Sequence, residues 1–512
     1  MDIAKNNRRI AKNTLMLYFR QILTLLVSLY TVRVVLDVLG VEDYGIYAVV
    51  GGIVSLLSFL SGTMASATQR FFAFALGQKD KERLNKVLSV NLIIYVVIAV
   101  GALILLETIG LWYVNNKLHI PIERFESARV VYHFAVLTFI ATILRSPFMA
   151  LIIAYEDMQI YAYMSIIEAI LKLGIVYLLV YISFDKLELY GILIFAVSLF
   201  TSLIYAVIAF YKYKDCRFKL SNWDKPMFKE ITGFTGWTLF GQISTVTRNQ
   251  AVTILMNQVF NPVIVAARAV ALNVSSQTNI FSSNFNTSLY PPIIKYYAAG
   301  EKENMFTLLF HGSKITFFLM WVLALPLMIE MEAVLNLWLK NPPQYAVLFT
   351  QLSIVESVIL SVSLPLTTAA RAPGRMKTYE LSLGLIQMAI FVVAWIVLRL
   401  GGAAYSVFIV AIVANIVMFF VRLYIVRNLI GLSVRRYIKQ VIIPVVMVGF
   451  ISILPSYLIH RTLPEGLIYS MISIVLSVVI CLITMYYVGL EKYFRDRIKK
   501  TVLFKIKNTI RN

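Results

Sequence analysis

Three arginines lie inside stretches of the sequence that are otherwise apolar enough to cross a membrane. Arg20 lies in the first stretch, and Arg248 and Arg268 lie in the seventh and eighth. Each charge costs roughly 2.5 to 3.5 kcal/mol at the centre of a membrane helix, and none of these three stretches contains a carboxylate that could neutralise it. The arginines therefore predict an anion that comes from elsewhere. The alternative, an arginine that extends to the lipid headgroups, fits Arg33 well and Arg268 in part.

Polar uncharged side chains accompany the arginines. In the first stretch, Thr24, Ser28 and Thr31 follow Arg20 at helical spacing, which predicts one polar stripe along a helix. Amides in the seventh and eighth stretches could form hydrogen bonds with a polar ligand; they are Gln242, Asn249, Asn273, Gln277 and Asn284. These faces predict a central water-filled cavity, although helix packing alone accounts for many of the small hydroxyl residues.

Two carboxylates at membrane depth could bind a coupling cation. Glu168 lies one helical turn before Lys172, a spacing that also favours a structural ion pair, and Glu356 lies in the tenth stretch. The two cysteines, Cys216 and Cys481, are far apart and predict neither a disulfide framework nor a metal site. The sequence has no P-loop for a nucleotide, and we expect no cofactor.

The composition predicts an all-α membrane protein. Of the 512 residues, 60% are apolar and 14% are charged, and apolar stretches of about 20 residues, enough to span roughly 30 Å of hydrocarbon, recur along the chain. We expect about fourteen transmembrane helices, near residues 14–36, 46–68, 87–112, 128–153, 160–183, 189–211, 234–256, 263–290, 305–329, 344–368, 379–400, 403–426, 440–460 and 466–488.

The distribution of charge predicts the orientation of these helices. The chain carries 47 Lys and Arg against 26 Asp and Glu, a net charge of +21, and most of the basic residues fall in loops on the side of the two termini. Basic loops stay in the cytoplasm, so both termini of this multi-pass membrane protein are expected there. The basic excess thus indicates topology and contact with membrane lipids, and no nucleic-acid partner is expected.

An internal repeat divides the chain. The segment RFFAFALGQKD (70–80) follows the second expected helix, and the similar segment KYYAAGEKE (295–303) follows the eighth. The two halves would enter the membrane in the same sense, as a parallel repeat. We therefore expect two pseudo-symmetric lobes of six helices at residues 1–215 and 216–432. Two further helices and a basic cytoplasmic tail would fill residues 433–512.

Four segments resemble loops of bacterial polysaccharide flippases, the Wzx-like branch of the MOP superfamily, which is related to the MATE exporters and the lipid II flippases. They are RVVLDVLGVEDYGIYAVV (33–50), ATQRFFAFALGQ (67–78), SLYPPIIKYYAAGEKE (288–303) and LNLWLKNPP (335–343). A departure is Asn261, where that family often has Gly. The resemblance implies a MATE-like fold of two lobes, a cationic cavity, and transport rather than catalysis. By helix and depth, the cavity arginines would be Arg20, Arg248 and Arg268.

The resemblance implies a flippase for polyprenyl-pyrophosphate-linked oligosaccharides that serves O-antigen, capsule or exopolysaccharide synthesis. The arginines would hold the pyrophosphate, the amides would bind the sugars, and alternating access would move the headgroup outward. A polysaccharide polymerase is a conceivable partner. Two other readings stay open: a cation-coupled multidrug exporter of the MATE class, and a membrane glycosyltransferase or polymerase.

Overall fold

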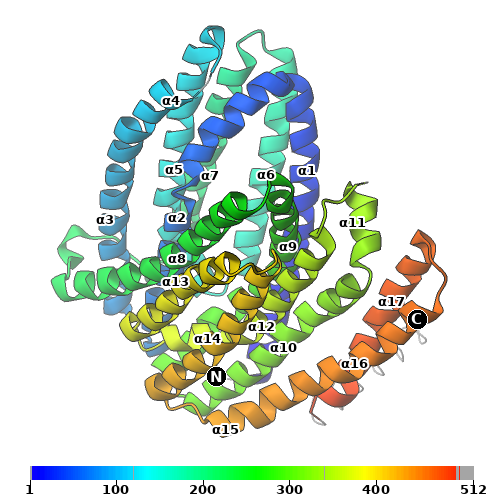
Figure 1. Cartoon of the computed structure of the whole chain (residues 1–512). Helices are drawn as coiled ribbons and strands as arrows, with labels where there is room; N and C mark the ends of the chain where they lie inside the picture. Colours follow the sequence, from blue (N-terminus) through cyan, green and yellow to red (C-terminus); the bar gives the residue numbers. More distant parts are fainter. Residues whose placement is uncertain (1–2, 119, 340, 492–494, 496–512) are drawn as a thin grey trace, which may run out of the picture. The chain divides into compact units, whose positions relative to one another are not determined.

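The computed structural model describes residues 3–118, 120–339, 341–491 and 495, and every regular element within them is a helix (Figure 1). The basic tail expected after the last helix lies almost entirely outside these residues. The chain divides into two compact units. Unit 1 contains residues 1–242 and 291–302, and unit 2 contains residues 243–290 and 303–512.

Unit 1 is built mainly from helices that precede residue 213. They are α1 (Ile3–Ser55), α2 (Ser58–Gln78), α3 (Lys81–Leu105), the short α4 (Leu111–Lys117), α5 (Phe125–Ala154), α6 (Met158–Tyr181) and α7 (Lys186–Lys212). The helix α5 packs along α7 and also contacts α2 and α3, while α1 packs along α6. Unit 1 also contains the first part of α8 (Lys225–Val259) and the end of α9 (Pro262–Ala298).

Unit 2 contains the remainder of α8 and α9 and the helices that follow. They are α10 (Lys302–Ile329), α11 (Met331–Leu339), α12 (Ala346–Arg371), α13 (Lys377–Arg399), α14 (Ser406–Ile430), α15 (Val434–Tyr437), α16 (Ile443–Thr462) and α17 (Leu467–Thr484). The helix α14 packs against both α12 and α13, and α16 packs against α17. On α10, Trp321 Nε1 donates a hydrogen bond of 2.9 Å to Ser452 Oγ, which ties α16 to the rest of the unit.

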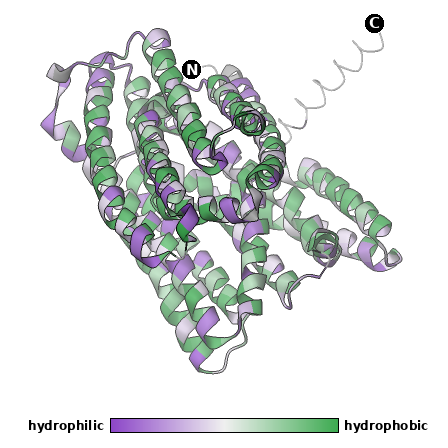
Figure 2. Ribbon diagram, turned by 90° about the horizontal axis from the view of Figure 1, so that it is seen from above, coloured by the Kyte–Doolittle hydropathy of each residue, from purple (hydrophilic) through white to green (hydrophobic). Residues whose placement is uncertain are grey.

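Eleven helices in the described residues are long and apolar enough to cross a membrane, or up to twelve if a bent pair forms one span. Figure 2 shows apolar residues along most of the helices. The bent pair comprises residues 42–55 and 58–78, with an angle of 44° at the break. The helices α8 and α9 are 35 and 37 residues long, which is long enough to cross a membrane. They are not among the eleven because the arginines and amides noted above make them too polar. The expectation of fourteen spans therefore stays a prediction.

Several boundaries differ from the expected ones. The first expected helix and the beginning of the second lie in the single element α1, and the rest of the second lies in α2. Within α1, Gly40 interrupts the helix with a φ of 78° and a ψ of 169°. The second span then breaks near Leu57. The helix α11 falls in a segment expected to be a loop. Helix α14 ends where Gly431 adopts a φ of 78°, the left-handed conformation that glycine accepts at low cost.

The repeated glycine motif does not occupy equivalent places in the backbone. Gly77 is a helical residue of α2, whereas Gly300 lies beyond the end of α9 with a φ of 75°. Gly77 instead permits a close helix contact inside unit 1, because an added Cβ would lie 2.6 Å from Lys295 O and 2.8 Å from Ala298 Cβ. The division into two symmetric lobes therefore stays a prediction.

An ion triad joins three segments at one end of unit 1. Arg124 donates from Nε to Asp43 Oδ1 over 2.7 Å and from Nη1 to Asp185 Oδ2 over 2.5 Å. Asp185 also begins α7, since its Oδ1 accepts hydrogen bonds from the backbone N–H groups of Leu187 and Glu188. Burial by itself would raise the pKa of Asp185, but the Arg124 guanidinium and these N–H groups outweigh it and hold the pKa below its usual value.

We expect Gly77→Ala to destabilise the protein by roughly 1 to 3 kcal/mol, because the new methyl group must displace backbone atoms of α9. The midpoint of thermal unfolding in detergent measures this effect. Gly174→Ala is the matched control, since nothing lies within 4 Å of a Cβ at that helical position. An equal loss of stability in both variants would contradict the close contact.

The Asp185 carboxylate should make part of the stability depend on pH. Because its folded-state pKa is lowered, its stabilising contribution is present at neutral pH and is lost as the pH falls below about 3.9, the ordinary value for Asp, and through the folded-state pKa. Asp185→Asn keeps a helix-capping side chain but removes the charge. The variant should melt at a lower temperature than the wild type at neutral pH, and the difference should shrink on acidification. A difference that does not change with pH would count against the triad.

Candidate functional site

A polar pocket of about 500 Å³ lies inside unit 1. One wall is the stripe of α1 that the sequence predicts, with Arg20, Thr24, Ser28 and Thr31. The helix α6 contributes Ser165, Glu168 and Lys172 to the lining. Residues three or four positions apart lie on one face of a helix. The spacing therefore places the four α1 residues on one face of α1 and the three α6 residues on one face of α6.

Arg20 is held in place by an aromatic side chain. Its Nη1 donates a hydrogen bond of 2.9 Å to the hydroxyl of Tyr161, and its guanidinium carbon lies 4.7 Å from the centre of the same ring. A guanidinium stacked on an aromatic ring in this way gains a favourable cation–π contact. The Arg20 side chain therefore lines the pocket in an orientation that Tyr161 helps to fix.

Glu168 is shared between two basic residues. Lys172 Nζ lies 2.8 Å from Glu168 Oε1, as the helical spacing predicts, and Arg145 Nη1 on α5 lies 2.7 Å from Glu168 Oε2. Arg145 is not among the predicted site residues, although it is another basic residue within an apolar stretch. Arg20, Arg145 and Lys172 thus accompany a single carboxylate, so this cluster carries an excess of positive charge.

In unit 2, Arg248 pairs with a carboxylate. Arg248 Nη1 lies 3.2 Å from Glu356 Oε1 on α12, and its Nη2 donates to Asn249 Oδ1 over 2.9 Å. The same Glu356 oxygen accepts a hydrogen bond of 2.9 Å from Asn415 Nδ2 on α14. The sequence predicted that an anion from outside this helix pairs with Arg248, and Glu356 of the same protein supplies it. The sequence suggested both residues, but only the packing of α8 against α12 pairs them.

Arg268 lies beside this ion pair. Its Nε donates to Thr253 Oγ1 over 3.3 Å, and its guanidinium carbon lies 5.4 Å from the centre of the Phe408 ring. The cavity that Arg248, Arg268 and Glu356 line holds only about 20 Å³. That volume suits about one water molecule, so the two arginines line a common but very small space.

The predicted amides lie in different surroundings. Asn249 lines the small cavity of unit 2, whereas Gln242, Asn273 and Gln277 are exposed and Asn284 is buried further along α9. The face of α9 between them packs on α12, where Ser275 Oγ lies 2.7 Å from Ser357 Oγ and Asn279 Nδ2 donates to the same hydroxyl. Sequence reasoning missed Asn415 and Tyr161, which position the charged groups.

Among the described residues, no group of three or more His, Cys, Asp or Glu could hold a metal ion. Both cysteines are buried and free. In the two clusters described above, the guanidinium and ammonium groups of Arg20, Arg145, Lys172, Arg248 and Arg268 are groups that can bind anions.

No family model matches the sequence, and no curated protein matches it. Solved structures do match. An outward-facing multidrug resistance MATE family transporter of the MOP superfamily shares 16% identity, with a TM-score of 0.71 over 83% of this chain and 96% of that one. A MATE in complex with MaD3S shares 15% identity, with a TM-score of 0.71 over 83% and 97%.

A third match is a MOP superfamily transporter from Pyrococcus furiosus, described as having a binding pocket whose reverse polarity suggests a different function. It shares 16% identity, with a TM-score of 0.65 over 84% of this chain and 97% of that one. At these identities the likeness concerns the fold. This chain is an all-helical, multi-pass membrane protein with the fold of the MATE transporters of the MOP superfamily.

Proposed function

We propose that this protein is a flippase that moves polyprenyl-pyrophosphate-linked oligosaccharides across the bacterial cytoplasmic membrane. The observation that carries the proposal is the pocket of unit 1, which places Arg20 and Lys172 around a space of about 500 Å³. That volume lies within the usual range for small-molecule sites, roughly 300 to 1,000 Å³. The positive excess of the pocket suits an anionic cargo.

The pyrophosphate is the part of such a cargo that this pocket can hold. Arg20 presents a planar set of donors that matches phosphate oxygens, and Lys172 adds a second positive charge. The hydroxyls of Thr24, Ser28 and Ser165 line the same space and can form hydrogen bonds with the first sugars. The lipid tail would stay in the bilayer, because only the headgroup needs a polar route.

Arg248 and Arg268 have a different place in this proposal. Their cavity has no room for a pyrophosphate while Glu356 pairs with Arg248. Alternating access would open it only if the helices that carry the two charges, α8 and α12, separate. In that state Arg248 would need a new anion, since an unpaired buried charge is costly, and a cargo phosphate could supply it. Glu168 and Glu356 stay candidates for a coupling cation.

A multidrug exporter is the second candidate, since the fold fits it equally well. The charge of the unit 1 pocket favours the flippase, because a cationic drug would meet Arg20 and Lys172 and find Glu168 already paired with two basic groups. The description of the Pyrococcus furiosus transporter indicates that pocket polarity varies within this fold. The flippase proposal also includes two further expectations: both termini lie in the cytoplasm, and a polysaccharide polymerase is a possible partner.

Cells that lack this protein should accumulate lipid-linked oligosaccharide on the inner leaflet, shielded from a glycan-cleaving enzyme added to spheroplasts. Wild-type protein should relieve the accumulation. The Arg20→Ala variant should move the oligosaccharide to the outer leaflet about tenfold or more slowly than the wild type, as expected when one charge-assisted hydrogen bond to the cargo is lost. The fraction of glycan cleaved over time measures the rate.

Arg33→Ala is the matched control, because Arg33 lies on the same helix, is exposed and does not line the pocket. It should behave as the wild type. Equal amounts of each variant in the membrane must be verified. The flippase proposal would be wrong if the deletion caused no accumulation and instead made the cells sensitive to cationic drugs, which would favour the exporter.

A further inference from the structure

A second pocket of unit 1 adjoins the pocket that Arg20 and Lys172 line, which we call the cationic pocket. The second pocket has a volume of about 300 Å³, and residues of α1, α2, α5 and α7 form its wall. It shares the lining residues Tyr47 and Ile194 with the cationic pocket. We call it the neutral pocket, because no charged residue in the described part of the chain lines it.

One face of α5 connects the two pockets. Ala135, Thr138 and Thr142 line the neutral pocket. Arg145 follows them at the same helical spacing and pairs with Glu168 of the cationic pocket. Thr138 precedes Arg145 by two helical turns, about 10 Å of rise. A headgroup held in the cationic pocket can therefore extend along α5 into the neutral pocket.

The hydroxyls of the neutral pocket can accept hydrogen bonds. Ser55 and Ser61 each donate to the backbone oxygen three residues earlier, over 2.8 and 3.0 Å. Thr138 and Thr142 each donate to the backbone oxygen four residues earlier, over 2.7 and 2.9 Å. Because the hydrogens of these hydroxyls are engaged, their oxygens offer acceptor capacity, which suits a ligand that is rich in hydroxyl donors.

Apolar and small residues form most of the remaining wall, among them Val54, Gly191 and Ile194. Tyr47 adds an aromatic ring, whose centre lies 4.9 Å from that of Tyr190 in an edge-to-face contact that helps to fix its orientation. A sugar combines apolar C–H faces with hydroxyl edges, so it matches a wall that combines apolar groups with acceptors. An isoprenoid chain would use the apolar groups alone.

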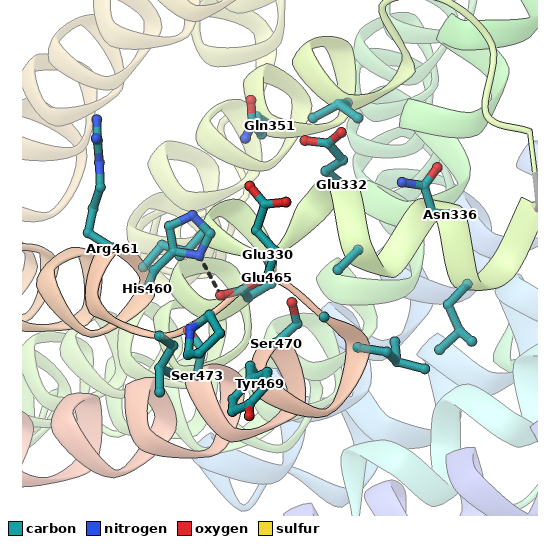
Figure 3. A pocket seen from close by; sticks show the side chains of 18 residues that line it. Glu330, Glu332, Asn336, Gln351, His460, Arg461, Glu465, Tyr469, Ser470 and Ser473 are labelled. Carbon is teal, nitrogen blue, oxygen red and sulfur yellow. Dashed lines mark hydrogen bonds and ion pairs between the residues drawn. The ribbon is translucent and has the colours of Figure 1, made fainter.

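A larger pocket, of about 750 Å³, lies in unit 2 and has a different character (Figure 3). Its wall contains Glu330, whose Oε1 lies 2.7 Å from His460 Nδ1. The exposed Glu332 and Glu465 line it as well, beside Arg461. Carboxylates repel a pyrophosphate, so this acidic pocket does not suit the headgroup of the proposed cargo.

We propose that the neutral pocket receives the sugar next to the pyrophosphate and selects a sugar without charge. This inference rests on the proposed flippase function and adds which headgroups the protein accepts. Arg20 and Lys172 would hold the pyrophosphate in the cationic pocket. The sugar ring would lie against Tyr47 and donate hydrogen bonds to Thr138 and Thr142. A uronic acid would bring a carboxylate into a pocket whose described lining offers no cation, and an unpaired charge away from water is costly.

The test uses the purified full-length protein in detergent and three soluble pyrophosphate diesters. Each probe carries a citronellyl group on one phosphate, and the other phosphate carries methyl, glucose or glucuronic acid. Titration calorimetry measures the three dissociation constants. The glucose probe should bind at least about tenfold more tightly than the methyl probe, as expected for the added hydrogen bonds. The glucuronic acid probe should lose this advantage.

The variant Ala135→Leu should narrow the neutral pocket, and Ala135 does not line the cationic pocket. The variant should lose the advantage of the glucose probe and bind the methyl probe as the wild type does, which also verifies its fold. The matched control is Ala196→Leu on α7, an exposed position that lines neither pocket, where the advantage should persist. The isosteric double variant Thr138→Val/Thr142→Val removes two acceptors and should weaken the glucose probe alone, which tests the same site without added volume.

Equal binding of the methyl and glucose probes would overturn the sugar site and leave the flippase proposal intact, whereas binding of no probe would contradict both. A glucuronic acid probe that binds as tightly as the glucose probe would contradict the selection for uncharged sugars. If both pocket variants kept the advantage of the glucose probe, the sugar would bind elsewhere. If both variants weakened the methyl probe as much as the glucose probe, the neutral pocket would not be a sugar site.

Discussion

A charged side chain inside a membrane protein must find a partner, and this requirement organises both compact units. Arg20 lies on the ring of Tyr161, Arg145 and Lys172 share Glu168, and Arg248 pairs with Glu356. Each contact joins two different helices, except for the pair formed by Glu168 and Lys172. In lipid there is no water to replace such a partner, so these contacts set how α1, α5, α6, α8 and α12 can pack.

The two units meet the requirement differently. In unit 2, Glu356 neutralises Arg248, and the remaining space is about 20 Å³. In unit 1, one carboxylate serves two basic residues, and Arg20 borders about 500 Å³. The pair of Arg248 and Glu356 stabilises one arrangement of helices, and Arg268 beside it leaves this cluster with a positive excess as well. The unit 1 pocket differs in its larger volume, which leaves room for an anion.

The sequence predicted what depends on single helices. The polar stripe of α1, the pair between Glu168 and Lys172, and most apolar spans follow from periodicity within one segment. It could not predict what depends on the packing of separate helices, such as Asn415 beside Glu356 or the exposure of Asn273 and Gln277. The interruption of α1 at Gly40 and the short helix α11 were also not predicted, because apolar content alone does not reveal where a helix changes direction.

The pair of Arg248 and Glu356 bears on how the proposed transport could be driven. In the flippase proposed above, Glu356 would compete with the anionic cargo for the guanidinium of Arg248. Neutralising Glu356, by a proton or by a bound cation, would weaken its hold on Arg248 and favour the cargo, since the same positive charge cannot be fully satisfied by both. Such competition links cation and anion binding through one side chain. It would allow an ion gradient to act on the cargo without any contact between the ion and the phosphate.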